Sequence, residues 1–284
     1  MRYYKIAGIV LKIVGIDDFS VEKMREYEVA ECAYDVCISI SDSQNIAKPD
    51  DVKEIARQKY RVYATCREGY CTYDEMGNNG LSALIVMDRA ISNVSVCARD
   101  VSHLGGASLS VRKFNMLAEV FRFVVLVRGG TVFHSSALMY DGHALLFSAP
   151  SGTGKSTHTG LWCQYMNGAE VFNDDSPAIM VENGQIFAYG TPWSGKSDLN
   201  KNVRLPVKAI VFLERATENS IDALNGKTAF LHLVSQSFKA PFTGLLNDML
   251  DVQEKIFENV KLYKLKCNIS KQAVDTVYNE VFKG

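Results

Sequence analysis

The sequence lacks a long uncharged hydrophobic run, and this absence bounds the class of protein. Its longest apolar stretch, residues 116–127, is interrupted by Glu119 and Arg122 and is too short to span a bilayer. The N-terminal run 6–15 contains Lys12, and no small-residue cleavage site follows it. We therefore expect neither a membrane-spanning helix nor a signal peptide, and we predict a cytoplasmic protein.

An excess of charge of one sign is also missing. Lys and Arg number 31 and Asp and Glu 32, for a net charge of -1. No whole-protein field then attracts nucleic acid or an anionic membrane, so we expect neither as a partner. The seven cysteines are an odd number without a CxxC pair, which favours reduced, buried thiols over a disulfide framework or a zinc site.

What is present indicates two domains, because 284 residues with 47% hydrophobic side chains can form two cores. Residues 1–110 read as short strand-like runs between polar turns, which predicts a mostly antiparallel α+β domain with substrate recognition as a candidate role. Within it we expect one short helix at 50–58, entered through Pro49, and a hairpin or tight loop at 77–80. Residues 111–284 form the second predicted domain.

The second domain begins with periodic apolar residues that predict a helix at 111–127. Two β runs follow, 131–139 and 143–148, and Asp141-Gly142 between them suits a type I′ hairpin. The spacing of later apolar residues predicts helices at 228–236, 244–259 and 270–282 and a strand at 261–266. Because the strand that ends at 148 is a hairpin arm, we expect an α/β domain with a mixed or antiparallel sheet.

A phosphate-binding loop of the P-loop type is predicted directly after that strand. The run 149–157 matches the Walker A pattern GxxxxGK[ST], except that Ala149 replaces the first glycine. Glycines allow backbone N–H groups to turn toward phosphate oxygens, and the helix that follows adds its positive dipole end. Lys155 would contact the β and γ phosphates, and the Ser156 hydroxyl would bind Mg²⁺. The candidate nucleotide-binding residues are Ser151, Gly152, Thr153, Gly154, Lys155, Ser156 and Thr157.

Two adjacent carboxylates, Asp174 and Asp175, follow a short strand-like run 19 and 20 residues after Lys155. Neighbouring side chains at a strand end point in opposite directions. One carboxylate can therefore hold Mg²⁺ while the other accepts a hydroxyl proton. The pattern does not order these two roles.

Three further residues are candidate contacts to phosphate or substrate. Trp193 and Lys196 lie in a loop after a strand, where an aromatic ring could stack on a base and an ammonium group could bind phosphate or an acidic acceptor. Arg204 lies in a polar stretch before Pro206 and could reach the γ phosphate. Each of the three also suits an ordinary structural role.

His134, the loop with Lys155 and Ser156, and the Asp174-Asp175 pair resemble the catalytic domain of HPr kinase/phosphorylase, a serine kinase whose fold is shared with phosphoenolpyruvate carboxykinase. The resemblance covers about residues 128–215. The segment 190–196 is more similar to HPr kinase-like proteins outside sugar regulation, including kinases of ribosomally made precursor peptides. The resemblance implies that Asp174 is the catalytic base, that Asp175 helps to hold Mg²⁺ and that His134 positions Asp174.

We accordingly predict an ATP-dependent, Mg²⁺-requiring kinase that acts on a hydroxyl group, that of Ser or Thr in a peptide or protein or that of a small molecule. Two alternatives stay open. One is phosphoenolpyruvate carboxykinase chemistry on the same fold, and the other is a regulator that binds nucleotide without catalysis. The resemblance to an oligomeric kinase makes a homo-oligomer an expectation as well.

Overall fold

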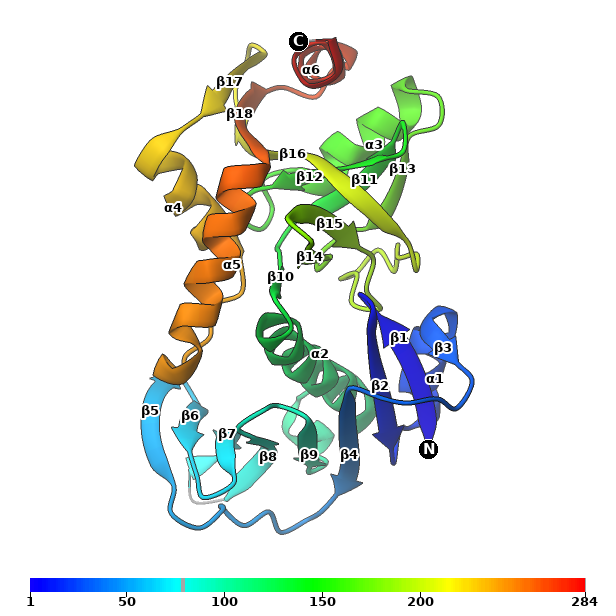
Figure 1. The fold of residues 1–284 in the computed structure, drawn as a ribbon. Helices are drawn as coiled ribbons and strands as arrows, with labels where there is room; N and C mark the ends of the chain where they lie inside the picture. The colour runs from blue at the N-terminus through cyan, green and yellow to red at the C-terminus, as the bar shows by residue number, and fades with distance from the viewer. Residues whose placement is uncertain (78–79, 284) are drawn as a thin grey trace. The chain divides into compact units, whose positions relative to one another are not determined.

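The chain folds as a mixed α/β protein with two mixed β-sheets and six α-helices among the residues described, 1–77 and 80–283 of a computed structural model (Figure 1). Two compact units divide it. Unit 1 comprises Met1–Arg128 with Ala240–Asn247, and unit 2 comprises Gly129–Lys239 with Asp248–Gly284. In the described residues, no helix is both long enough and apolar enough to cross a membrane.

Unit 1 is built on a nine-stranded sheet in the order β3-β1-β2-β4-β9-β8-β7-β6-β5. Its pairs are antiparallel except that β4 runs parallel to both β2 and β9. The strands are β1 (Arg2–Ile6), β2 (Ile9–Val14), β3 (Glu28–Val29), β4 (Val36–Asp42), β5 (Lys53–Gln58), β6 (Arg61–Thr65), β7 (Gly69–Glu75), β8 (Leu81–Asp88) and β9 (Asn93–Ala98). A mostly antiparallel α+β unit is what the sequence predicts for this part of the chain.

The predicted helix at 50–58 is wrong, because residues 53–58 form β5, an edge strand paired antiparallel with β6. The pairing with β6 overrides the local helix signal from Pro49. The tight loop predicted at 77–80 connects two antiparallel strands, β7 and β8. Asn78 and Asn79 themselves lie outside the described residues.

Helix α2 (Leu109–Val127) belongs to unit 1, so the division at Arg128 differs from the predicted boundary at 110. Ser108 caps the helix by accepting a hydrogen bond from the N–H of Val111. The Phe114 ring contacts Phe19 in α1 (Asp18–Met24) edge-on, with ring centroids 5.9 Å apart. Helix α2 therefore packs within unit 1.

Unit 2 contains a second nine-stranded sheet, with the path β10-β14-β15-β16-β12-β11-β13 and with β18 and β17 added at β16. Its strands are β10 (Gly130–Val132), β11 (Ser136–Tyr140), β12 (His143–Ser148), β13 (Glu170–Asn173), β14 (Ala178–Glu182), β15 (Gln185–Tyr189), β16 (Arg204–Arg215), β17 (Ser220–Leu224) and β18 (Lys261–Cys267). The β11–β12 pair is antiparallel, whereas β12 and β18 both run parallel to β16. The sheet is therefore mixed, as the hairpin signal predicts.

The central strands of unit 2 are buried on both faces. In β12, Ala144 and Leu146 contribute to one apolar cluster and Leu145 and Phe147 to the other, as expected for the period of two in a strand. Helices α4 (Gly226–Gln236) and α5 (Leu246–Asn259) add side chains to the first cluster. Helices α3 (Lys155–Tyr165) and α6 (Lys271–Tyr278) add side chains to the second. These bounds agree with the predicted late helices to within a few residues at most ends.

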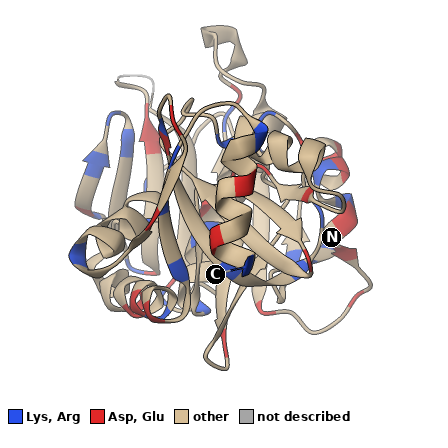
Figure 2. Ribbon diagram, turned by 90° about the horizontal axis from the view of Figure 1, so that it is seen from above, with Lys and Arg blue, Asp and Glu red and all other residues tan. Residues whose placement is uncertain are grey.

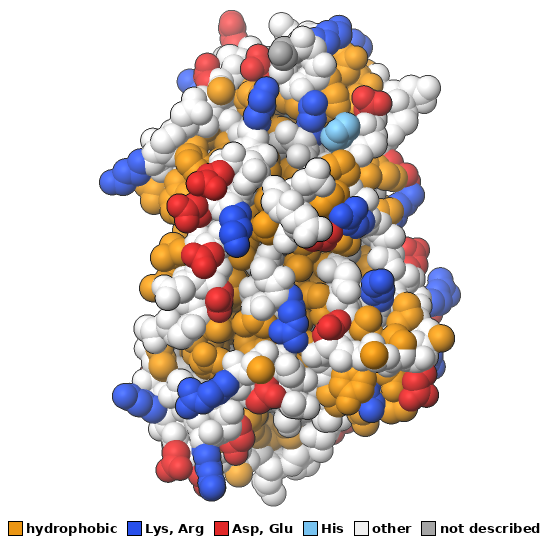
Figure 3. Space-filling view, in the orientation of Figure 1, with side chains coloured by type: hydrophobic (Ala, Val, Ile, Leu, Met, Phe, Trp, Pro, Cys, Tyr) orange, Lys and Arg blue, Asp and Glu red, His pale blue; other side chains and the backbone are white. Residues whose placement is uncertain are grey.

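Charged side chains of both signs are interspersed along the chain, in keeping with the net charge of -1. Figure 2 shows Lys and Arg next to Asp and Glu on helices and strands alike. On the face drawn in Figure 3, basic and acidic side chains alternate with apolar ones.

The hairpin between β11 and β12 allows a test of backbone conformation. Asp141 and Gly142 have φ values of 48° and 71°, the left-handed pair of a type I′ turn. A Cβ on Gly142 would meet nothing within 4 Å, so Gly142→Ala should lower the free energy of unfolding by about 1–2 kcal/mol through the backbone alone. Urea denaturation measures this change.

Gly160 in α3 is the matched control, because a Cβ there also meets nothing within 4 Å while the backbone is helical. Gly160→Ala should leave the free energy of unfolding unchanged or raise it by up to about 1 kcal/mol. Equal destabilisation by the two substitutions would contradict the role of the turn.

Candidate active site

Strand order brings four segments of unit 2 to one edge of its sheet. Strand β11 is antiparallel to both β12 and β13, so the ends of β12 and β13 lie beside the start of β11. The register pairs Ser136 with Phe147 and Ala137 with Asn173. Strand β16 runs parallel to β12, with Phe212 opposite Ser148, and ends at the same edge. Residues that directly follow β12, β13 and β16 therefore converge with those that precede β11.

The segment after β12, residues 149–154, is a glycine loop that leads directly into α3. Gly152 and Gly154 have φ values of 77° and 117°, which favour glycine because it has no Cβ. Gly154 occupies the N-cap position of α3, where no side chain caps the helix among the described residues. The first N–H groups of α3 are thus available to an anion, which the helix dipole also favours.

Lys155, the first residue of α3, is only 9% exposed, and its ammonium group has fixed partners. Its Nζ lies 2.8 Å from Nε2 of His134 and donates to the carbonyl oxygen of Ala149 at 3.1 Å. Burial lowers the pKa of Lys155, and the nearby charges of Asp175 and Asp174 oppose that shift. Ala149, which replaces the first glycine of the Walker A pattern, therefore accepts a hydrogen bond from Lys155 through its backbone carbonyl.

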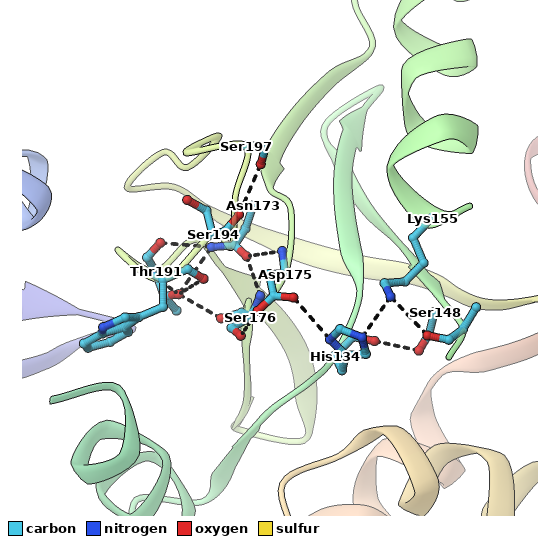
Figure 4. A network of polar contacts seen from close by, with 11 residues as sticks. His134, Ser148, Lys155, Asn173, Asp175, Ser176, Thr191, Ser194 and Ser197 are labelled. Atoms are coloured by element: carbon cyan, nitrogen blue, oxygen red, sulfur yellow. Dashed lines mark hydrogen bonds and ion pairs between the residues drawn. The ribbon is translucent and has the colours of Figure 1, made fainter. Parts of the chain in front are cut away.

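His134 lies between Lys155 and Asp175 (Figure 4). The predicted β run 131–139 is in fact two strands, β10 and β11, and His134 occupies the break between them. Its N–H donates to the carbonyl oxygen of Gln236 at 2.9 Å, and its own carbonyl accepts from Ser148 Oγ at 2.7 Å. With Nε2 accepting from the ammonium group, the ring proton lies on Nδ1, which is 3.4 Å from Oδ1 of Asp175.

The two carboxylates after β13 have different environments. Ser176 Oγ donates to Oδ2 of Asp175 at 2.8 Å, and the Asp175 side chain is 39% exposed. Burial by itself would raise the pKa of Asp175, but the hydrogen bonds from His134 and Ser176 and the charge of Lys155 lower it overall. Oδ1 of Asp174 is buried and makes no hydrogen bond with any described residue. The residue paired with His134 is thus Asp175, not Asp174 as the resemblance implies.

A cavity of about 410 Å³ is lined by Asp174 and by Ser156 and Thr159 of α3. Mg²⁺ takes oxygen ligands and commonly binds through one or two protein groups together with phosphate and water. A buried carboxylate oxygen without a partner and a nearby hydroxyl group fit such a cation. The described residues contain no cluster of three or more His, Cys, Asp or Glu side chains arranged around a metal.

A buried polar network fixes the turn that carries both carboxylates (Figure 4). Oδ1 of Asn173 accepts from the N–H groups of Asp175 and Ser176, at 3.2 and 2.8 Å. Its Nδ2 donates to the carbonyl oxygen of Thr191 at 2.9 Å, and Oγ1 of Thr191 donates to the carbonyl oxygen of Ser176 at 2.8 Å. Asn173 and Thr191 are both fully buried. Neither residue belongs to a motif predicted from the sequence, although an amide directly before two carboxylates is a local signal of such a turn.

The remaining predicted contacts are placed differently. Trp193 is 8% exposed and therefore has little face left for stacking on a base, whereas Lys196 is exposed in the same loop. A Cβ on Gly195 of this loop would lie 3.1 Å from Cβ of Asp175, so the loop is tight against the carboxylate.

Arg204 contacts Glu182 and Phe187. Its Nη2 forms an ion pair with Oε2 of Glu182 at 2.6 Å, and its guanidinium carbon lies 3.4 Å from the centre of the Phe187 ring. The predicted contact with the γ phosphate does not agree with these partners. The strand pairing of β15 with β16 explains the difference, because it sets Tyr189 opposite Arg204.

Arg215 is a second basic residue that contacts the glycine loop. Its guanidinium group donates to the carbonyl oxygen of Thr153 at 3.0 Å and to that of Gly152. The sequence indicates only a charged residue at the end of a buried strand, and the parallel pairing of β16 with β12 decides where that charge lies. Two cavities flank the loop here. One of about 400 Å³ includes Thr157 and Leu161, and one of about 800 Å³ includes His232 and Gln236.

Comparison with known proteins identifies one family. A protein-family model described as "SynChlorMet cassette protein ScmC" matches residues 106–277, more than half of the chain. No curated protein matches the sequence. Among solved structures, the Hpr(Ser) kinase/phosphatase from Coxiella burnetii is similar with a TM-score of 0.32 and 13% identity, over 54% of this chain and 97% of that one. That score is too low to establish a shared fold.

The lowered pKa of Asp175 predicts how stability depends on pH. A carboxylate whose folded pKa lies below its ordinary value of 3.8 stabilises the folded state at higher pH, and this stability is lost as the pH falls through the folded pKa. Asp175→Asn removes the titrating group. Urea denaturation should therefore show wild type more stable than Asp175→Asn at about pH 6, with a gap that shrinks below about pH 4. A gap independent of pH would contradict the contacts of Asp175.

The Thr191 hydroxyl predicts a second stability change. Thr191→Val keeps the shape of the side chain but leaves the buried carbonyl of Ser176 without its donor, so the free energy of unfolding should fall by about 1–3 kcal/mol. Thr191→Ser keeps the hydroxyl group and should cost less. A Thr191→Val variant as stable as wild type in urea would show that the network does not hold this turn.

Proposed function

The chain belongs to the ScmC family of SynChlorMet cassette proteins, and we propose that it is an ATP-dependent, Mg²⁺-requiring kinase that phosphorylates a hydroxyl group, that of Ser or Thr in a peptide or protein. The observation that carries this proposal is the line from the glycine loop through Lys155 and His134 to Asp175. It joins a candidate phosphate site to a carboxylate that is open to solvent. Sequence resemblance to HPr kinase-like proteins adds support from the motifs.

Phosphate binding would use the glycine loop and the first turn of α3. The uncapped N–H groups supply donors, and the ammonium group of Lys155 supplies a positive charge against the transferring end of the nucleotide. Arg215 would hold the loop in shape through its hydrogen bonds to the carbonyl oxygens of Gly152 and Thr153. A phosphate oxygen that takes up the Lys155 ammonium would replace His134 or Ala149 as its partner.

The contacts support Asp175 as the proton acceptor, the opposite of the order that the resemblance implies. Asp175 is partly exposed, and His134 and Ser176 orient its carboxylate. In the transfer step the acceptor O–H bond breaks and its proton goes to Asp175. A bond then forms from the acceptor oxygen to the γ phosphorus, and the electron pair of the cleaved P–O bond leaves with ADP.

Asp174 and Ser156 would hold the metal. Both line the cavity of about 410 Å³, and Oδ1 of Asp174 is the buried acceptor without a hydrogen-bond partner among the described residues. Mg²⁺, when bound, would neutralise charge on the phosphate oxygens. Replacing Asp174 should therefore weaken Mg·ATP binding, and replacing Asp175 should chiefly slow the transfer.

The first candidates for the phosphoryl acceptor are peptides encoded in the same cassette, because the family description names its members as cassette proteins. A small Ser- or Thr-containing product of the same cassette is the first substrate to test. Mass spectrometry of that peptide after incubation with Mg·ATP detects a phosphorylated residue directly. Release of phosphoenolpyruvate from oxaloacetate, or tight ATP binding without transfer to any acceptor, would instead support the two alternative functions.

Paired variants test the two carboxylates. Asp175→Asn should slow phosphoryl transfer by about 100-fold or more with little change in ATP affinity, as expected for loss of a general base. Asp174→Asn should raise the Mg²⁺ concentration needed for half-maximal ATP binding. Asp251→Asn, an exposed carboxylate in α5, is the control and should change neither quantity.

Transfer at the wild-type rate by Asp175→Asn would disprove its assignment as the base. If Asp174→Asn abolishes transfer while its Mg²⁺ requirement and ATP affinity stay normal, the two roles are reversed. Lys155→Met tests the nucleotide site independently of the fold. This variant should lose ATP binding, and its circular dichroism spectrum should remain that of the folded protein.

A further inference from the structure

A cavity of about 400 Å³ lies beside the glycine loop, and neither Asp174 nor Asp175 lines it. It begins at Gly154 and Thr157 and extends to the ends of β16 and β18, where Leu213, Cys267 and Ile269 line it. Asp174 lines a different cavity, with Ser156. A chain of phosphates bound at the loop with its transferring end at Asp174 and Asp175 would therefore direct its other end into this space.

Part of the cavity wall is apolar, with an uncovered apolar residue at its rim, and Glu214, Arg215 and Asn268 supply the charged and amide groups of the lining. Leu161 and Leu213 contribute aliphatic side chains. Ile269 is 78% exposed, the largest value among the large hydrophobic side chains described. Small-molecule sites are concave and mostly apolar, with a few polar groups that fix orientation. A flat apolar ring would cover Ile269 and fill this volume.

His158 supplies a polar group of that kind. It lines the same cavity, and the residue is 3% exposed. Its Nε2 accepts from the indole N–H of Trp162 at 3.3 Å, and an indole can only donate. The ring proton therefore lies on Nδ1, and this N–H has no hydrogen-bond partner among the described residues.

The larger cavity on the other side of the loop is less suited to an apolar ring. His232, Gln236 and Lys264 line it and do not line the smaller cavity. The ammonium group of Lys264 forms an ion pair at 2.5 Å with Glu214, which lines both cavities. Polar and charged groups that are already paired lose hydrogen bonds or hydration when an apolar group covers them.

We propose that the 400 Å³ cavity binds the nucleoside part of the nucleotide, with the base against Leu161 and Ile269 and an acceptor atom of the nucleoside on Nδ1–H of His158. This inference rests on the proposed function, because it assumes that the glycine loop binds the triphosphate. It assigns to His158 and Trp162 a role in ligand binding as a hydrogen-bonded pair in which the indole sets the tautomer of the imidazole.

The test compares ATP with inorganic tripolyphosphate, which has the phosphates without the nucleoside. Isothermal titration calorimetry with Mg²⁺ should give wild type a clearly lower Kd for ATP than for tripolyphosphate. Ile269→Ser should raise the Kd for ATP about tenfold, which corresponds to loss of one buried apolar side chain. Its Kd for tripolyphosphate should stay within about twofold of wild type, since the change leaves the glycine loop intact.

Leu231→Ser is the matched control, because Leu231 is 55% exposed, lies in α4 and lines neither cavity. It should change neither Kd. For His158, the Gln variant keeps an N–H donor and the Phe variant does not, so His158→Phe should bind ATP about fivefold more weakly than His158→Gln. The exposed Ile269 position keeps the test decisive even where a change at buried His158 unfolds the protein.

The outcomes separate the two proposals. Tripolyphosphate binding as tight as ATP binding in wild type, or an equal loss of both in Ile269→Ser, overturns the nucleoside site and leaves the kinase proposal standing. Binding of neither ligand by wild type overturns both.

Discussion

The buried ammonium group of Lys155 is the feature on which the arrangement of the site depends. A charge so far removed from water requires acceptors, and it has Nε2 of His134 and the carbonyl oxygen of Ala149. Because His134 accepts on one ring nitrogen, the proton on the other faces Asp175. The position of one lysine thus orders an imidazole tautomer and, through it, the environment of a carboxylate.

Strand order makes that convergence possible. Strand β11 lies between β12 and β13 and is antiparallel to both, so the glycine loop, the carboxylate turn and His134 come together at one sheet edge. Parallel pairing of β16 with β12 and of β18 with β16 adds Arg215 and Ile269 to the same edge. The mixed character of the sheet is therefore what assembles the site, since a simple hairpin succession would separate these segments.

Local signals in the sequence predicted much of this. The glycine loop, the hairpin at Asp141-Gly142 and the amphipathic helices each depend on residues close together in the chain, and the structure has them near their predicted positions. Predictions failed where pairing with a distant segment decided the outcome. Residues 53–58 of the predicted helix form an edge strand, Arg204 pairs with Glu182, and the predicted run 131–139 breaks at His134.

The sequence by itself determined which chemical groups are present: a lysine after a glycine loop, two adjacent carboxylates, a histidine and a hydroxyl group. Their spacing identified them as a set, because loop and helix geometry follow from local residues. Only the tertiary structure decided that His134 faces Asp175, that Asp174 shares a cavity with Ser156 and that Arg215 holds the loop. These relations join segments far apart in the chain, and strand register, which no local pattern specifies, sets the distances between them.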